Sequence, residues 1–366
     1  MALGILTLLF AIILAILPLG EAKDVQLKVK GIVASVFTPI DDYGYVNFNV
    51  IPQYAQSLKD RGINGVLVGG YNGEGTKFSI WDRRQLLSTW IEAATPLGLF
   101  VLFQVGGIPL PDAQDLASFA EQIGVSAILI YPDCIYKPKN PKELVYYVGI
   151  IASSAPNTPI LYYHIPQVTG VNVDMVKFFD LASDQIDNFK GLKVETFDTA
   201  LKLRGRMEGD QRVFISNSVY LGPAALAGFD SFILSDATVF PRLVDLIVRY
   251  GKSGDRRRVN SFSQRLIDLN EVISAQGNNL AALKATMSLV TDIDVGRIKD
   301  PTLQLTAEQE NNLERRLKDE GIKVKQRQNN NQETYGRKRI YPPRPPVIYY
   351  DEAGRGSGPV AEPVEN

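Results

Sequence analysis

Eight short apolar runs recur along the chain between residues 31 and 236, and longer amphipathic segments separate them. The runs span residues 31–40, 65–70, 99–106, 127–132, 159–166, 189–195, 212–217 and 231–236. They are rich in Val, Ile, Leu and Phe, and most are continuous rather than alternating, which is the pattern of strands buried on both faces. The runs therefore predict a parallel sheet that is covered on both sides.

The segments between the runs carry apolar residues at three- and four-residue spacing, which is the helix period. Examples are residues 51–61, 82–94, 112–123, 141–154 and 175–182. Eight strand-helix units fit a (β/α)8 TIM barrel of the α/β class better than a doubly wound sheet, which usually has about six strands. Three later segments, residues 256–274, 279–290 and 307–318, predict additional C-terminal helices that pack on the barrel.

The chain begins with a segment typical of protein targeting. Residues 3–19 are almost wholly apolar, Pro18 and Gly20 break a helix, and Gly20 with Ala22 supplies small residues for a signal peptidase. We therefore expect residues 1–22 to be a signal peptide and residues 23–320 to form the barrel domain. This interpretation places the protein outside the cell, as a secreted protein, or in the secretory-pathway lumen. The length of the apolar run leaves an uncleaved membrane anchor as the alternative.

Composition narrows the chemistry that this chain can perform. The formal net charge of -1 gives no global electrostatic reason to bind nucleic acid or an anionic membrane. Cys134 is the only cysteine, which excludes an intramolecular disulfide, and His164 is the only histidine, which excludes a multi-His metal site. If Tyr163 faces the barrel interior, His164 faces the helices and packs there. We predict no metal and no cofactor.

Residues 321–366 differ from the rest of the chain in composition, because Gln, Asn, Arg, Pro and Gly dominate them. Within residues 321–344, seven Lys and Arg residues oppose Glu333 alone. Such a segment does not bury enough apolar surface to offset chain entropy, so we predict a disordered, basic and proline-rich tail. The tail is either a solvated charge run or a contact site for a polyanion or extracellular matrix.

One lysine and one tyrosine stand where they suggest covalent chemistry. Lys193 ends the apolar core of its run, and Tyr163 lies in the preceding run, one strand-and-helix period earlier. An amine at the mouth of a strand-lined core is partly desolvated, which favours its neutral and nucleophilic form. A phenol one strand away can then move a proton. The pair predicts Schiff-base chemistry on a 2-oxo acid, and the alternative is a strand-end lysine with its ammonium in water.

Five motifs extend this pair to a family resemblance. They are Phe37-Thr38-Pro39, Gly70-Tyr71-Asn72-Gly73-Glu74-Gly75, Tyr162-Tyr163-His164-Ile165-Pro166 with Thr169-Gly170-Val171, Gly191-Leu192-Lys193, and Lys284-Ala285-Thr286-Met287 with Leu289-Val290. They resemble the N-acetylneuraminate lyase and dihydrodipicolinate synthase superfamily of pyruvate-dependent class I aldolases, and within it the animal N-acetylneuraminate lyases. The resemblance extends over about residues 30–318.

The resemblance implies a role for each motif. The lysine that matches Lys193 forms an imine with C2 of pyruvate, and the tyrosine that matches Tyr163 shuttles the proton. The glycine-rich turn that begins at Gly70 offers backbone N–H groups to the substrate carboxylate. The implied partners are a small-molecule 2-oxo acid and further copies of the chain in a homotetramer. No cofactor is implied.

Two departures from the family pattern bear on catalysis. Tyr71 and Asn72 stand where the family usually has two hydroxyl residues, and an amide does not relay a proton as a hydroxyl does. Alternation along the strand places Glu195 on the same face as Lys193. A carboxylate there would raise the pKa of Lys193 and repel an anionic substrate. The alternative is that Glu195 turns toward an amine or a hydroxyl of the substrate.

A third departure concerns the sugar end of the site. Sialic acid lyases carry an Asp-Glu pair after the seventh strand, and Ser218 and Val219 match it here. Ser216 replaces a glycine before this pair, and after the eighth strand Ser235 keeps the family's hydroxyl while Asp236 adds an acid near the mouth. We therefore expect a substrate other than ordinary sialic acid. The candidate substrate-binding residues are Gly70, Tyr71, Asn72, Glu195, Ser216 and Ser235.

Two functional hypotheses stay open at this point. The first is an aldolase-lyase that cleaves a 2-oxo acid to pyruvate and an aldehyde through a Lys193 imine, with Tyr163 as proton shuttle. The second is a catalytically inactive secreted relative that acts as an extracellular binding or matrix protein. The second hypothesis follows from the leader, the basic tail and four altered residues, which are Tyr71, Asn72, Glu195 and Val219. The orientation of the Glu195 carboxylate distinguishes the two.

Overall fold

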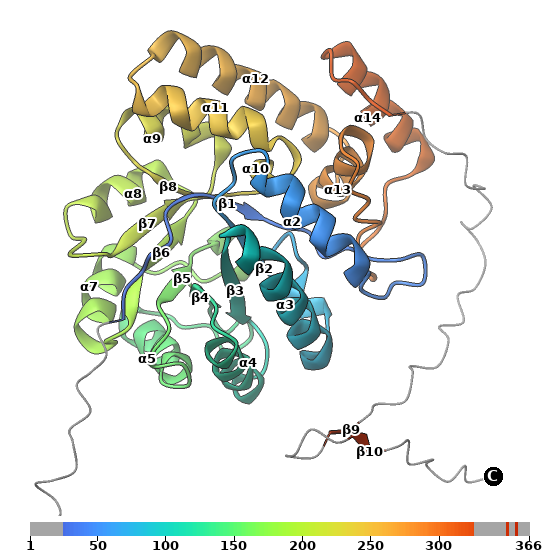
Figure 1. The fold of residues 1–366 in the computed structure, drawn as a ribbon. Coiled ribbons are helices and arrows are strands. Elements are labelled where there is room, and N and C mark those ends of the chain that lie inside the picture. Colours follow the sequence, from blue (N-terminus) through green and yellow to red (C-terminus); the bar gives the residue numbers. More distant parts are fainter. Residues whose placement is uncertain (1–24, 326–348, 351–355, 358–366) are drawn as a thin grey trace, which may run out of the picture. The chain divides into compact units, whose positions relative to one another are not determined.

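A computed structural model describes residues 25–325, 349–350 and 356–357, and its central feature is a closed barrel of eight parallel strands (Figure 1). The strands are β1 (Gly31–Ser35), β2 (Gly65–Val68), β3 (Phe100–Gly106), β4 (Ala127–Tyr131), β5 (Ile160–Tyr163), β6 (Phe189–Val194), β7 (Arg212–Ile215) and β8 (Ser231–Leu234). Each strand lies within one of the eight apolar runs, and β8 closes the barrel against β1. The predicted (β/α)8 barrel is confirmed.

Helices follow the strands and cover the outside of the barrel. They are α2 (Ile51–Lys59), α3 (Ile80–Ala94), α4 (Leu110–Gln122), α5 (Pro141–Ala152), α6 (Pro166–Thr169), α7 (Met175–Gln185), α8 (Phe197–Arg204), α9 (Leu221–Leu226), α10 (Asp236–Val239) and α11 (Pro241–Lys252). Single 3-10 turns lie at Phe48–Val50, Gly75–Lys77, Thr95–Leu97 and Ser218–Tyr220. Within the described residues, no helix is both long enough and apolar enough to cross a bilayer.

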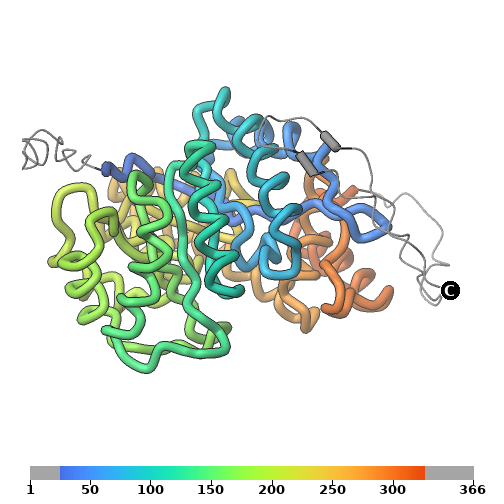
Figure 2. The backbone as a smooth tube through the Cα atoms, turned by 90° about the horizontal axis from the view of Figure 1, so that it is seen from below, coloured from blue at the N-terminus to red at the C-terminus, as the bar shows by residue number. Residues whose placement is uncertain are grey.

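The predicted C-terminal helices are present as α12 (Arg256–Ser274), α13 (Asn279–Val290) and α14 (Ala307–Asp319). In Figure 2, α13 and α14 lie on the side of the barrel opposite α7. The chain stays packed up to Lys325, beyond the predicted domain end at residue 320, because the Lys325 N–H donates to the Leu289 carbonyl at 3.0 Å. The predicted signal peptide and nearly all of the predicted tail lie outside the described residues.

The chain beyond Lys325 forms a separate unit, described only at two short strands. These are β9 (Tyr349–Tyr350) and β10 (Gly356–Ser357), which pair antiparallel.

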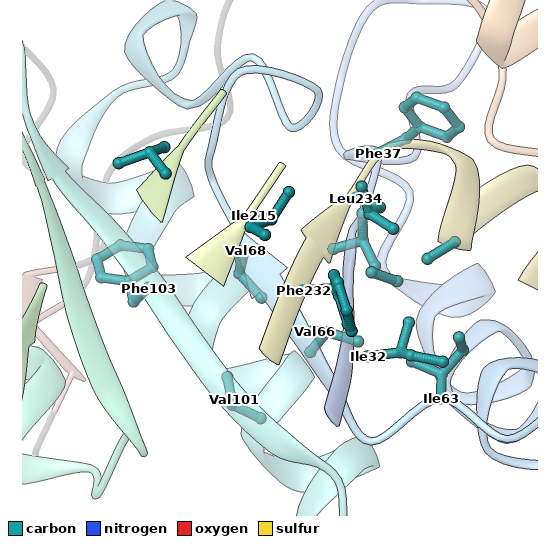
Figure 3. Close-up of a cluster of buried hydrophobic side chains, with 14 of the residues drawn as sticks. Ile32, Phe37, Ile63, Val66, Val68, Val101, Phe103, Ile215, Phe232 and Leu234 are labelled. Carbon is teal, nitrogen blue, oxygen red and sulfur yellow. The ribbon is translucent and has the colours of Figure 1, made fainter. Parts of the chain in front are cut away.

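Two apolar cores hold the barrel together, one inside the strands and one between the strands and the helices. Because successive strand residues point to opposite faces, every strand except β6 contributes to both cores, and β6 contributes apolar side chains to the outer one only. The inner core comprises Leu27, Val29, Val33, Leu67, Leu102, Ala127, Leu129, Tyr131, Leu161, Tyr163, Ile165, Phe214 and Ile233. Figure 3 shows part of the outer core, with Ile32, Val66, Val101 and Phe103 among the labelled side chains. The interior is therefore filled, and reactive groups are confined to its ends.

Side-chain caps fix where several helices begin. Helix α3 starts at Ile80 rather than at residue 82, because Ser79 and Asp82 form a capping box that satisfies the first free N–H groups. Thr306 and Gln309 do the same for α14. Hydrophobic periodicity alone does not include these capping residues, which is why it places the start of α3 two residues late.

Gly191 is a backbone requirement within β6. Its φ is +139°, and a Cβ there would lie 1.8 Å from the Arg212 carbonyl oxygen of β7. The register between β5 and β6 also shifts beside it, between Ile160 and Leu161. Only glycine fits this irregularity, which sets the register that places Lys193 opposite Tyr163.

We predict that Gly191→Ala lowers the free energy of unfolding by about 3 kcal/mol or more, because it combines backbone strain with a clash against a neighbouring strand. Urea unfolding followed by circular dichroism measures the change. Gly205→Ala is the matched control, since its φ is -78° and a Cβ there meets no atom within 4 Å. Equal stability of the two variants would contradict this account of Gly191.

Candidate active site

The carboxyl ends of β4, β5 and β6 bring three titratable side chains to one end of the barrel. Tyr163 and Lys193 are direct register partners on β5 and β6, and Tyr131 ends the adjacent β4. All eight strands are parallel, so these ends meet at the same rim. In barrels of this kind, the rim at the strand carboxyl ends carries the active site.

Lys193 is buried, with only 4% of its surface exposed. Its Nζ lies 4.0 Å from the centre of the Tyr163 ring, so an aromatic face takes the place of water around the amine. Burial lowers the pKa of Lys193 from 10.5 to about 7. A large share of the amine is therefore neutral near neutral pH, which is the form that attacks a carbonyl.

Glu195 lies just beyond β6 and is half-buried. Its carboxylate acts on Lys193 in the predicted direction, because it raises the pKa of the amine, but desolvation outweighs this effect. Among the ion pairs of residues 25–325, none joins the two side chains. The amine is therefore not locked in a salt bridge, and Glu195 raises its pKa by less than burial lowers it.

Tyr163 has 2% of its surface exposed, and burial raises the pKa of its phenol well above the usual value. Glu195 raises this pKa further, whereas the Tyr131 hydroxyl and the Tyr71 backbone lower it. The phenol is therefore neutral in the resting site. It is a proton donor there, and it becomes an acceptor only after it has lost its own proton.

The glycine-rich turn after β2 lies directly over these groups. A Cβ on Gly70 would be 3.6 Å from a ring carbon of Tyr163, and one on Gly75 would be 2.1 Å from the Gly69 carbonyl oxygen. These close approaches explain why the turn contains so many glycines. The Tyr71 side chain is 46% exposed at the rim.

Asn72 has a structural role in this turn. It is 3% exposed, and its Nδ2 donates to the Ser35 carbonyl of β1 at 3.1 Å. Thr38 holds the same turn from the other side, because its Oγ1 donates to the Gly73 carbonyl at 2.6 Å. Asn72 therefore fixes the backbone of the turn, and its amide does not replace the family's hydroxyl as a proton relay.

Glu74 anchors the far end of the turn, a role that the sequence motifs did not reveal. Its side chain is fully buried and lies 2.8 Å from Lys77 Nζ and 3.5 Å from Lys284 Nζ. It also accepts the Lys299 N–H at 2.9 Å. Lys284 donates in turn to the Thr38 carbonyl at 3.0 Å. The glycine motif and the Lys284 motif, far apart in sequence, thus meet in one ionic cluster.

The rim at β7 and β8 differs from the sequence expectation. Ser216 Oγ donates to the Val194 carbonyl at 3.0 Å, and Asn270 donates to Ser218 Oγ at 3.1 Å. Asp236 was expected as an acid near the mouth, but it is buried beside Ser218 and Asn270; burial raises the pKa of its carboxyl and these partners lower it. Val219 is 51% exposed.

The remaining candidate side chains differ in burial and in ionisation, and Cys134 lines a cavity together with Tyr131. Ser235 is half-buried at the end of β8. His164 packs outside the strands beside Tyr162, and burial lowers its pKa to about 4, so it is neutral. Partial burial raises the pKa of Cys134 and disfavours a thiolate. In the part of the chain that the structure describes, no group of three potential metal ligands occurs.

Residues 28–320 match the model of the dihydrodipicolinate synthetase family. The chain belongs to this family. It is 32% identical over 309 residues to the N-acetylneuraminate lyase of Rattus norvegicus, covering 80% of this chain and 92% of the relative. The human N-acetylneuraminate lyase is 30% identical over 308 residues, with the same coverage.

Solved structures support the same assignment. The N-acetylneuraminate lyase of Proteus mirabilis superposes with a TM-score of 0.74 at 27% identity, covering 80% of this chain and 99% of that chain. The resemblance to the superfamily that the sequence motifs indicated is confirmed.

We predict that Glu195→Gln lowers the pKa of Lys193, because the carboxylate that favours the charged amine is removed. Below pH 7 the variant then holds more neutral amine than the wild type. Chemical acylation of Lys193, quantified by peptide mass spectrometry as a function of pH, measures this shift. Asp198→Asn is the control, since Asp198 is exposed and paired with Lys202. An unchanged profile in Glu195→Gln would show that the two groups do not interact.

Proposed function

We propose that this protein is a class I aldolase-lyase that cleaves a 2-oxo acid to pyruvate and an aldehyde through an imine on Lys193. The observation that carries the proposal is the buried amine, whose Nζ lies 4.0 Å from the Tyr163 ring centre and whose pKa burial lowers to about 7. Membership in a family of aldolases supports the reaction type.

Imine formation makes use of both side chains. The neutral Lys193 amine adds to the C2 carbonyl of the substrate and gives a carbinolamine. The hydroxide that leaves C2 takes the proton of the Tyr163 phenol and departs as water. An iminium on Lys193 and a phenolate on Tyr163 result, so the charges balance within the site.

Bond cleavage follows from these two charges. The Tyr163 phenolate takes the proton of the C4 hydroxyl while the C3–C4 electron pair moves into the iminium, which gives an enamine and releases the aldehyde. Tyr163 then returns the proton to C3 of the enamine. Addition of water to the resulting iminium releases pyruvate and restores the neutral phenol.

The backbone of the glycine-rich turn, residues 70–73, is suited to bind the substrate carboxylate. Asn72, Thr38 and the Glu74 cluster hold this turn over the Tyr163 ring, so its N–H groups are fixed before substrate binds. A backbone site of this kind tolerates the change from hydroxyl residues to Tyr71 and Asn72. The relatives named N-acetylneuraminate lyase suggest a sugar-derived 2-oxo acid as substrate. Ser218 and Val219 favour one other than ordinary sialic acid.

We also propose a homo-oligomer that works in the secretory pathway or outside the cell. Ile135 and Tyr136, in the loop after β4, are 81% and 86% exposed, and Val168 is 54% exposed. Apolar side chains of this size on a rim loop favour contact with another chain. The apolar leader, residues 3–19, supports the location.

Incubation with pyruvate and borohydride tests the proposed function. We expect the mass of one reduced pyruvyl group on the peptide that contains Lys193, and no adduct in Lys193→Met. Lys202→Met, which changes an exposed lysine of α8, is the matched control and should be labelled like the wild type. Absence of an adduct in the wild type would leave the alternative of an inactive relative that serves as a binding or matrix protein.

A further inference from the structure

Arg83, on the first turn of α3, is a buried positive charge without a counter-ion. Only 1% of its surface is exposed, and no carboxylate of residues 25–325 forms an ion pair with it. Its Nη2 donates to the backbone carbonyl and to Oε1 of Gln104, but its Nε and Nη1 have no hydrogen-bond partner. Two buried donors of a guanidinium are thus left unused.

Burial of a charge without an opposite charge destabilises the folded state. Burial lowers the pKa of Arg83 to about 10, and the group therefore remains cationic near neutral pH. Lys284, another deeply buried cation near the glycine-rich turn, is paired with Glu74. Arg83 differs because no carboxylate of residues 25–325 pairs with it.

Arg83 lies in the same region of the barrel as Tyr131. The guanidinium lies beneath the glycine-rich turn, where a Cβ on Gly69 would be 3.8 Å from Nη2. Gln104, to which it donates, precedes Gly106 on β3, and Gly106 is the register partner of Tyr131. The two side chains are near enough that each affects the ionisation of the other.

Tyr131 connects this charge to the Lys193 site. Its ring centre lies 4.5 Å from that of Tyr163, and only 7% of its surface is exposed. Its buried hydroxyl acts on the Tyr163 phenol as a hydrogen-bond donor, which lowers the pKa of Tyr163 and raises that of Tyr131. A hydroxyl in this position can strengthen its hydrogen bond once the Tyr163 oxygen becomes negative.

We propose that Arg83 and Tyr131 are positioning residues that stabilise the Tyr163 phenolate of the working site, Tyr131 by donating its hydroxyl hydrogen to the phenolate oxygen and Arg83 by supplying the opposite charge. The inference rests on the proposed function, since imine formation is the step that removes the phenol proton. The missing counter-ion of Arg83 is then a charge that exists only during turnover. Pre-placed charges of this kind need no rearrangement when the reaction occurs.

Exchange of the pyruvate methyl protons in deuterium oxide tests this inference without knowledge of the true substrate. The Tyr163 phenolate removes a methyl proton from the Lys193 iminium of pyruvate, and nuclear magnetic resonance follows the loss of the methyl signal. We expect Tyr131→Phe and Arg83→Gln each to slow exchange by about 10-fold or more. The acid limb of the pH profile should move to higher pH, because a less stabilised phenolate has a raised pKa. Arg83→Lys should restore part of the rate.

Arg84→Gln is the matched control. Arg84 neighbours Arg83 on α3 but pairs with Asp115 and stacks on Phe119, so exchange should stay at the wild-type rate. Thermal unfolding establishes that each variant is folded. If Arg83→Gln does not fold, Tyr131→Phe decides, because it removes only a hydroxyl and keeps the ring that packs against Tyr163.

The outcomes separate the inference from the proposed function. A wild-type rate and pH profile in folded Tyr131→Phe, with the pyruvate adduct still formed on Lys193, would overturn the inference and leave the aldolase proposal standing. A wild-type protein that forms no adduct and exchanges no protons would overturn both. Slow exchange with the shifted profile and an intact adduct supports both.

Discussion

Desolvation of one amine is the interaction on which the chemistry of this barrel depends. Lys193 is nearly inaccessible to water, and an aromatic ring faces its nitrogen, so a large share of the amine is neutral near neutral pH without any added base. The same burial keeps the Tyr163 phenol neutral. In the proposed reaction, the neutral amine and the neutral phenol become charged together, as iminium and phenolate. The closed barrel stabilises this buried arrangement, because its eight strands supply the packing that excludes water.

The charged side chains near the site differ in whether an opposite charge neutralises them. Glu74 and Lys284 neutralise each other and hold the turn, so their charges contribute to structure. Arg83 has no such partner among residues 25–325, and we propose that its charge stabilises a negative oxygen next to Tyr131. Glu195 acts in the opposite sense on Lys193, and its effect is smaller than that of burial. The charge state of each group therefore depends on how deeply it is buried as much as on its residue type.

Two of the residues that depart from the family pattern have structural contacts in the folded chain. Asn72 is committed to the β1 carbonyl, and Asp236 is enclosed by Ser218 and Asn270. Neither substitution places a new group in front of Lys193. Tyr131, by contrast, was not among the candidate site residues, yet its ring centre lies 4.5 Å from that of Tyr163. A sequence motif identifies the residue at each position, whereas the roles of Asn72, Asp236 and Tyr131 depend on contacts with residues elsewhere in the chain.

The sequence by itself determined the barrel, its eight strands and the Lys193–Tyr163 pair, because continuous apolar runs at regular spacing permit few other folds and strand ends fall at one rim. The helix ends depended on caps such as Ser79. Only the tertiary structure decided that burial outweighs Glu195 and that Arg83 is buried without an ion pair among the described residues. Solvation and distance set a group's charge, and both are properties of residues far apart in the chain that folding brings together.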